Sequence, residues 1–199
     1  MRALIYDRTQ GALSQIWSKG SVLYRGLGRL DQTFGATTWD EALDWLAGLP
    51  DPIDELQFWG HGKWGCALVN HTVLDVSSLR ARRSQLEAVR ERLTDDPLIW
   101  FRTCETFGAH AGHDFAERYA DFFGARVAGH THIIGAQQSG LQGLRPGERA
   151  HWSAEEGLRS GTPAAPLRAY GSALWRPRTI TALGGRVPEA WFDSPEPRG

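Results

Sequence analysis

The sequence predicts an α/β protein with a mainly parallel central sheet and helices on both faces. Apolar runs of strand length occur at residues 3–6 and 98–101, residues 53–59 alternate apolar with polar side chains, and a further strand is expected at 125–129. Segments with helical spacing of apolar residues separate these runs, and strands that alternate with helices favour parallel pairing. The run at 98–101 is apolar throughout, which is typical of a strand buried on both faces of a parallel sheet.

The first third of the chain contains one clear helix signal. We expect a central strand at 3–6, whereas residues 11–29 fit either a helix or a short strand at 22–25, because glycines interrupt the apolar pattern. Residues 38–49 predict a helix, with Thr38 and Glu41 placed as a capping box. The order so far is strand, undecided segment, helix.

The middle of the chain predicts a hairpin and a long helix. After the strand at 53–59, runs at 65–69 and 72–76 flank Asn70 and His71, which is typical of a hairpin turn. Ser77 or Ser78 is then expected to cap a helix that continues to Leu93.

The pattern is regular up to about residue 131 and poorer beyond it. A helix at 112–123 ends at Gly124, which suits the left-handed position after a helix, and a strand follows at 125–129. Glycines and prolines at 135–166 favour loops and short hairpins. A late strand is expected at 179–183.

Length and composition limit the possible classes of protein. The 199 residues fit one domain, which we expect to span 1–193, with a disordered tail at 194–199. Lys and Arg total 22 against 23 Asp and Glu, so nothing in the charge favours binding to nucleic acid or an anionic membrane. Only two cysteines occur and no apolar run reaches spanning length, so we expect a cytoplasmic protein.

Two chemically reactive side chains follow strands. Cys104 comes shortly after the run at 98–101, and His61 lies between two glycines after the strand at 53–59. The carboxyl ends of parallel strands open onto the crevice where ligands bind, so both groups are expected at one edge. A thiol needs a neighbouring base to become a nucleophile. The simpler interpretation is that Cys104 packs as a small apolar residue and that His61 only ends a strand.

These residues carry a resemblance to a known superfamily. A strand that ends in His61-Gly62, an apolar strand that ends in Cys104, and a glycine-marked helix and strand after it resemble the caspase-like cysteine peptidases. Cys104 follows His61 by 43 residues, close to the roughly 50 that separate the two in caspases. Within the superfamily the chain is most similar to a bacterial caspase-like domain of unassigned function, over residues 3–157. The Gln-Ala-Cys signature of caspases is absent.

The resemblance implies a fold and a mechanism. The fold is a caspase-like three-layer α/β/α sandwich. The reaction is peptide-bond hydrolysis with Cys104 as nucleophile and His61 as general base and acid, and the backbone N–H groups of Gly62 and Cys104 stabilise the oxyanion. A third catalytic residue, a cofactor and a metal are not expected, the substrate is a protein or peptide, and a regulatory protein partner is compatible with this class.

Specificity is left open between several readings. In the resembled enzymes the first substrate pocket lies near the end of the first strand and just before the cysteine, which points to Asp7 and Arg102. Asp7 would favour Arg or Lys in the substrate, a free Arg102 would favour Asp or Glu, and a pair between them would leave no preference. Trp64, beside His61, and Glu105, after Cys104, are further candidates for substrate contacts.

The sequence also allows a metal site and a function without catalysis. His110, His113, His130 and His132, with Asp114, make an imaginable zinc site, although no Cys-x-x-Cys supports it. A catalytically inactive caspase-like binding or assembly module is the alternative to an enzyme.

Overall fold

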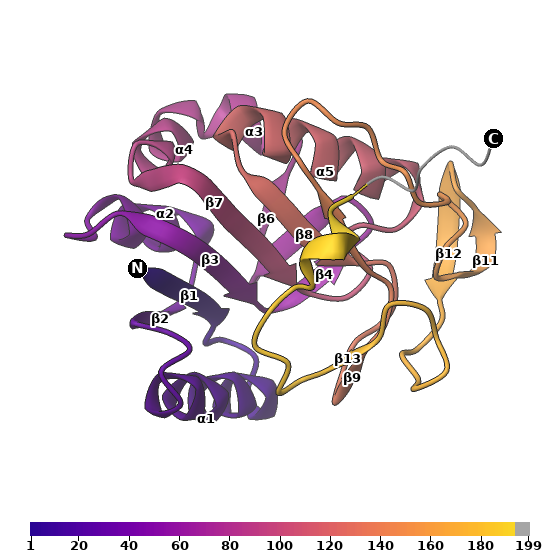
Figure 1. Cartoon of the computed structure of the whole chain (residues 1–199), viewed down its shortest axis with the longest axis horizontal. Coiled ribbons are helices and arrows are strands. Elements are labelled where there is room, and N and C mark those ends of the chain that lie inside the picture. The colour runs from indigo at the N-terminus through magenta and orange to yellow at the C-terminus, as the bar shows by residue number, and fades with distance from the viewer. Residues whose placement is uncertain (194–199) are drawn as a thin grey trace.

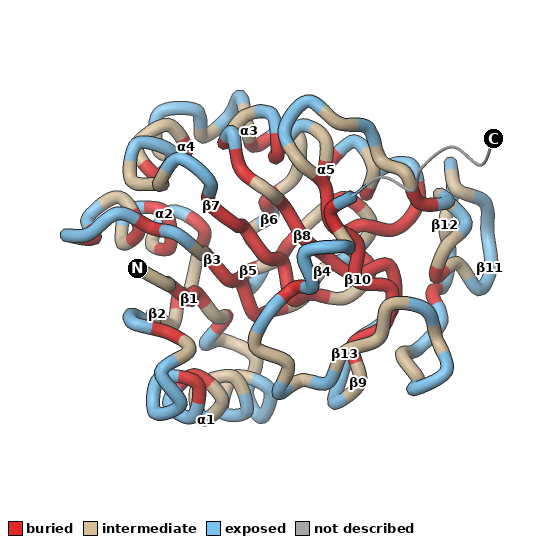
Figure 2. The backbone as a smooth tube through the Cα atoms, in the orientation of Figure 1, coloured by how far each residue is buried: buried red, intermediate tan, exposed pale blue. Residues whose placement is uncertain are grey.

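The central sheet of the protein has six strands. The computed structural model describes residues 1–193, and the strand order is β10-β8-β7-β3-β1-β2 (Figure 1, with β10 labelled in Figure 2). All neighbouring strands pair in parallel except β10 with β8, which pair antiparallel. The predicted α/β class with a mainly parallel sheet is therefore confirmed. The strands are β1 (Arg2–Asp7), β2 (Gln32–Ala36), β3 (Ile53–Trp59), β7 (Leu93–Arg102), β8 (Arg126–His130) and β10 (Leu141–Leu144).

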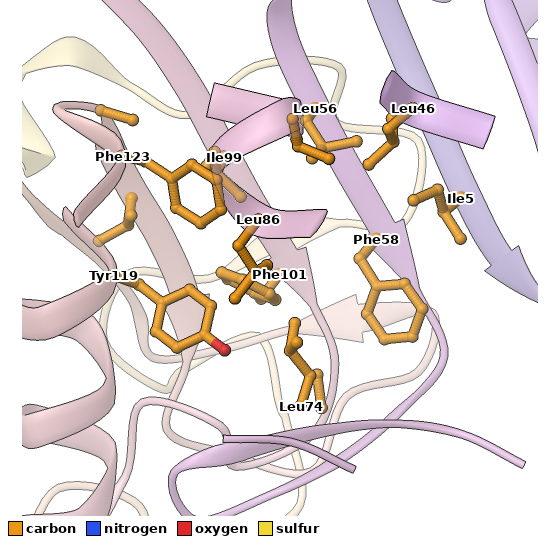
Figure 3. Packing of buried hydrophobic residues seen from close by; sticks show 14 of the residues in the cluster. Ile5, Leu46, Leu56, Phe58, Leu74, Leu86, Ile99, Phe101, Tyr119 and Phe123 are labelled. Atoms are coloured by element: carbon orange, nitrogen blue, oxygen red, sulfur yellow. The ribbon is translucent and has the colours of Figure 1, made fainter. Parts of the chain in front are cut away.

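Most of the helices cover one face of the sheet. The helices are α1 (Ala12–Gly26), α2 (Trp39–Ala47), α3 (Ser78–Ala81), α4 (Arg83–Arg90), α5 (Ala109–Phe123) and the short 3₁₀ helix η1 (Glu189–Trp191). Apolar side chains of α2, α4 and α5 share one cluster with strand residues, which Figure 3 shows. We call this side the packed face; its labelled members are Ile5, Leu46, Leu56, Phe58, Leu74, Leu86, Ile99, Phe101, Tyr119 and Phe123.

The other side of the sheet, which we call the open face, has a thinner cover. Tyr24 of α1 packs there with Leu4 and Trp59, while Val187 and Phe192 pack on Trp100. Helix α1 buries little: Ser21 and Tyr24 are its only residues that are buried, and most of the helix is exposed in Figure 2. The third layer of the sandwich therefore consists of one helix and an irregular C-terminal segment.

Three small sheets lie beside the central one. β4 (His61–Lys63), β5 (Cys66–Val69) and β6 (Thr72–Asp75) form an antiparallel sheet directly after β3. β9 (Gln137–Gln138) pairs with β13 (Ile180–Thr181), and β11 (Leu158–Thr162) pairs with β12 (Ala165–Ala169). The predicted hairpin around Asn70 is present, and β4 adds a third strand to it.

Local signals placed two helix ends correctly. The Thr38 side chain accepts a hydrogen bond from the Glu41 N–H at 3.2 Å, while the Glu41 carboxylate accepts from the N–H and hydroxyl of Thr37 rather than closing a capping box. Gly124 adopts the left-handed conformation after α5, with φ 59°. The predicted capping box therefore marks the start of the helix correctly, but the Glu41 carboxylate bonds to Thr37 instead of Thr38.

Several expectations need correction. Of the two alternatives left open for segment 11–29, the helix is the one that forms. Strand β1 lies second from the edge rather than at the centre. The helix expected to run to Leu93 breaks at Arg82, and Leu93 pairs with Ile53 because β7 begins there. The N–H of Ser78 is capped by the Asp75 carboxylate, not by a serine. The late strand is only β13. The tail predicted at 194–199 lies outside the described residues.

Among residues 1–193, no helix is long and apolar enough to cross a membrane.

Candidate active site

The register of two central strands brings His61 and Cys104 to equivalent positions. Trp59 at the end of β3 is the parallel partner of Arg102 at the end of β7. His61 follows Trp59 by two residues, and Cys104 follows Arg102 by two. Adjacent strands run about 4.8 Å apart. The two side chains therefore leave the sheet from neighbouring strands at the same level, as strand-end reasoning predicted.

The loop that carries Cys104 is fixed by backbone hydrogen bonds. The Glu105 N–H donates to the His132 carbonyl at 3.1 Å, and the Phe107 N–H donates to the His130 carbonyl at 3.0 Å. Glu105 has φ 58°, a conformation that L side chains rarely adopt. Such strain persists only where the surroundings hold the backbone, and it is frequent at functional sites.

The β4–β5 hairpin docks directly on this loop. The Gly65 N–H donates to the Thr106 carbonyl at 3.0 Å, and the Thr106 hydroxyl donates to the Cys66 carbonyl at 3.1 Å. A Cβ at Gly62 would lie 2.7 Å from the Cys104 carbonyl oxygen and 2.3 Å from Thr106 Oγ1. Only glycine permits this approach, so the sequence His61-Gly62 allows the histidine strand to touch the cysteine loop.

Cys104 is a half-buried free thiol at rest. Burial raises its pKa, and the negative charge of Glu105 raises it further, whereas a hydrogen bond from the Ile134 N–H to Sγ at 3.4 Å lowers it. Burial predominates, so the group is a thiol rather than a thiolate at neutral pH. Within residues 1–193, the backbone N–H of Cys104 donates to no other group, which leaves it available to a ligand.

His61 is held by packing rather than by polar contacts. Its ring lies edge-on to Trp17 of α1, with 5.6 Å between ring centroids. In the part of the chain that the structure describes, neither ring nitrogen makes a hydrogen bond to protein, and the Cys104 thiol contacts the backbone of Ile134 rather than His61. The His61 ring therefore lines the pocket with both nitrogens unengaged by the described protein groups.

His61 and Cys104 line the same pocket. It has a volume of about 430 Å³ and lies on the open face, between α1 and the loops that follow β8 and β13. Trp17 and Tyr24 form its α1 wall, and Arg102 and Gln138 form its polar side. A concave, mostly apolar site with a few polar groups is the usual form of a ligand pocket.

Asp7 and Arg102 do not pair. The Asp7 carboxylate is fully buried and accepts hydrogen bonds from Thr9 and from the Asn70 N–H at 3.0 Å, so it fixes the end of β1 against the hairpin. Asp7 does not line the pocket, whereas Arg102 does. The structure therefore separates two residues that the sequence left as possible partners.

Trp64 and Glu105 lie near the cysteine loop but outside the pocket lining. The Lys63 ammonium lies over the Trp64 ring at 4.9 Å, and the ring packs beside Gly108. Burial raises the pKa of the Glu105 carboxyl. The charge of Glu105 therefore acts on the Cys104 thiol, and Trp64 packs against Gly108.

The imagined zinc site is not assembled. Among the described residues, no group of three or more His, Cys, Asp or Glu is arranged to hold a metal. His130 Nδ1 lies 3.1 Å from the Ser139 carbonyl, and His132 Nδ1 lies 2.9 Å from Thr131 Oγ1. It is the backbone carbonyls of these two histidines, rather than their rings, that accept hydrogen bonds from the cysteine loop.

Sequence reasoning missed Trp17, Tyr24 and Gln138. Tyr24 and Trp17 lie in the segment whose helical pattern glycines obscured, and Gln138 lies in the stretch where boundaries were poor. The aromatic spacing in 11–29 was the available signal for the α1 wall. Nothing local marks Gln138.

The fold and pocket define a class: an α/β protein with a six-stranded, mostly parallel sheet and a cysteine–histidine pocket at its carboxyl edge. Residues 35–143, more than half of the chain, match the family described as a domain of unknown function, DUF4347, and the chain belongs to that family. The match spans both His61 and Cys104. No curated protein and no solved structure matches the chain.

Proposed function

We propose that the protein is a caspase-like cysteine endopeptidase in which Cys104 attacks a peptide carbonyl and His61 transfers the proton. The observation that carries this proposal is that the two side chains follow register partners and line one pocket. A protein or peptide is the proposed substrate, and the cytoplasm is the proposed location.

The resting thiol sets the order of events. Because burial raises the pKa of Cys104, His61 takes the thiol proton as Sγ forms a bond to the carbonyl carbon. The oxyanion then accepts hydrogen bonds from the N–H groups of Cys104 and Gly62. Collapse breaks the C–N bond, and His61 gives its proton to the leaving amine.

Hydrolysis of the thioester completes the cycle. Water loses a proton to His61 and adds to the thioester carbonyl, and the C–S bond breaks. The sulfur recovers the proton from His61 and the product leaves as a carboxylic acid. No other proton carrier is required, which agrees with a dyad.

A second candidate is a caspase-like fold that binds or assembles without turnover. The same raised pKa of Cys104 favours it, because an unactivated buried thiol is typical of a structural cysteine. A regulatory protein partner fits either candidate.

Alkylation separates the two candidates. Burial raises the pKa of both Cys104 and Cys66, so thiol acidity alone predicts slow reaction of both. If His61 acts as base, iodoacetamide at pH 7 modifies Cys104 much faster than Cys66, and His61→Ala slows Cys104 alone. His71→Ala is the matched control, because His71 is exposed on the β5–β6 turn. Equal, slow labelling of both cysteines would contradict the peptidase and favour the binding or assembly module.

A further inference from the structure

The pocket beside Cys104 contains a buried cation without a carboxylate partner. Arg102 is 4% exposed, and within residues 1–193 no Asp or Glu lies at ion-pair distance from its guanidinium. Glu55 acts on Arg102 only from farther away, and its carboxylate accepts a hydrogen bond from Gln57 at 2.6 Å. An unpaired charge in this environment is costly. Arg102 therefore has an uncompensated charge that an anionic ligand would balance.

Neutral groups hold the guanidinium in place. Nε and Nη2 donate to Gln138 Oε1 at 3.2 and 2.8 Å, Nη2 also donates to the Ala182 carbonyl at 2.8 Å, and Nη1 donates to the Tyr24 hydroxyl at 3.0 Å. Its charged carbon lies 4.4 Å from the Trp100 ring centre. These contacts fix the orientation of Arg102 and contribute no negative charge. A preorganised arginine of this kind is well suited to a planar carboxylate.

Donors, rather than acceptors, are left available on the polar side. One N–H of Arg102 Nη1 has no partner among the described residues. Because Gln138 Oε1 accepts from Arg102, its amide nitrogen is on the other side, where it has no protein acceptor within residues 1–193. No Asp or Glu lines the pocket. The vacant hydrogen-bonding capacity therefore matches an acceptor-only group.

We propose that this pocket selects an acidic side chain, aspartate or glutamate, in the substrate, with Arg102 and Gln138 as the residues that determine the choice. The inference rests on the proposed peptidase function, whose carbonyl target would sit at Cys104. The exclusion of Asp7 from the pocket removes the reading in which Arg or Lys is preferred. The apolar α1 wall, with Ile16 63% exposed and Leu23 49% exposed, suits an apolar residue next to the acidic one.

Binding tests the pocket without turnover. In the Cys104→Ala protein, calorimetry compares acetylated tetrapeptide amides that differ only in the last residue: Asp, Glu, Asn or Arg. The Asp or Glu peptide is expected to bind about 10- to 100-fold more tightly than the Asn peptide, the range for one hydrogen bond to a charged group. Arg102→Gln, added to Cys104→Ala, should abolish the difference.

A second variant tests the pocket even if the Arg102→Gln protein does not fold. Gln138→Ala, which leaves the Arg102 charge in place, should reduce the preference without removing it. Arg118→Gln, on the exposed surface of α5, is the matched control and should bind as the parent does. Equal affinity for Asp and Asn peptides, a preference for Arg, or no binding of any peptide would overturn the inference. The labelling of wild-type Cys104 then shows separately whether the proposed peptidase function stands.

Discussion

The two faces of the central sheet are built from the same strands and differ in what they bury. In β7, Ile99 and Phe101 join the packed face, whereas Trp100 points to the open face, followed there by Arg102. In β3, Phe58 belongs to the packed face and Trp59 to the open one. Strand alternation alone separates these sets.

The difference is one of chemistry as well as packing. The packed face buries rings in contact with one another, such as Phe115 stacked on Tyr119 with centroids 4.1 Å apart. The open face buries polar and ionisable groups instead, among them Gln57, Arg102 and His130. Buried polar groups lower stability unless they are satisfied, and proteins tolerate them at functional sites. We infer that the packed face supplies stability and the open face supplies the site.

The largest expected effect tests the packed face. Phe115 is fully buried and contacts Phe101, Phe107 and Tyr119. Phe115→Ala should lower the free energy of unfolding by about 3–5 kcal/mol, because it loses apolar contacts and leaves a cavity. Urea denaturation measures the change.

The open face supplies the matched comparison. Ile16→Ala removes an apolar side chain that is largely exposed on α1, and its effect on unfolding should stay within about 0.5 kcal/mol. Comparable losses for Ile16→Ala and Phe115→Ala would contradict the division of roles between the faces.

The next effect concerns the β4–β5 hairpin, which docks on the Cys104 loop at the carboxyl edge of the sheet. Gly62→Ala places a Cβ against the Cys104 loop, and such overpacking costs about 1–3 kcal/mol. Urea denaturation gives that cost, and the iodoacetamide rate of Cys104 reports whether the loop has moved.

Gly26→Ala is the control, because a Cβ at the end of α1 meets nothing within 4 Å. It should be neutral or stabilise by up to about 1 kcal/mol. If Gly62→Ala behaved in the same way, the close docking of the hairpin on the loop would be refuted.

A smaller effect arises from the ionisable groups of the open face. Burial lowers the pKa of His130 to about 3 from an ordinary value of 6.5. Between these values the unfolded chain binds a proton that the folded chain does not, so stability is present above pH 6.5 and is lost as the pH falls. The loss per histidine is about 1.4 kcal/mol for each pH unit inside this window.

Denaturation at pH 7, 6 and 5 measures this slope. His130→Gln should reduce the slope of unfolding free energy against pH by the contribution of one histidine. His71→Gln, at an exposed turn, should leave the slope unchanged. An identical slope in the His130 variant would mean that the ring is not held neutral by burial.

Much of the packed face could be predicted from the sequence, because many of its signals are local. Apolar–polar alternation predicted β3, a continuous apolar run predicted β7, Thr38 predicted the start of α2, and Gly124 predicted the end of α5. Strand β2 was missed. Glycine is required at position 35 of this strand because a Cβ there would lie 2.8 Å from the Tyr6 ring. That contact joins two strands, so no local sequence pattern reveals it.

The candidate site could be predicted only in part, for the same reason. Strand ends indicated His61 and Cys104, because parallel strands terminate at one edge. The partners of Arg102 come from Tyr24, Gln138 and Ala182, separated from it by 36 to 80 residues. Such a constellation depends on tertiary structure, so the sequence left Asp7 and Arg102 either as alternative determinants of specificity or as partners of each other. The structure separates them, because Arg102 lines the pocket and Asp7 does not.

The smallest expected effect is electrostatic and acts on the Cys104 thiol at the carboxyl edge of the sheet. The negative charge of Glu105 is one of the causes that raise the pKa of the Cys104 thiol, and it ranks below burial. Glu105→Gln keeps the shape and the left-handed backbone and removes the charge. The pH profile of iodoacetamide labelling at Cys104 should therefore move to lower pH. Glu91→Gln, exposed after α4, should leave the profile in place, and a shift to higher pH in the Glu105 variant would show that the carboxylate assists the thiolate instead of opposing it.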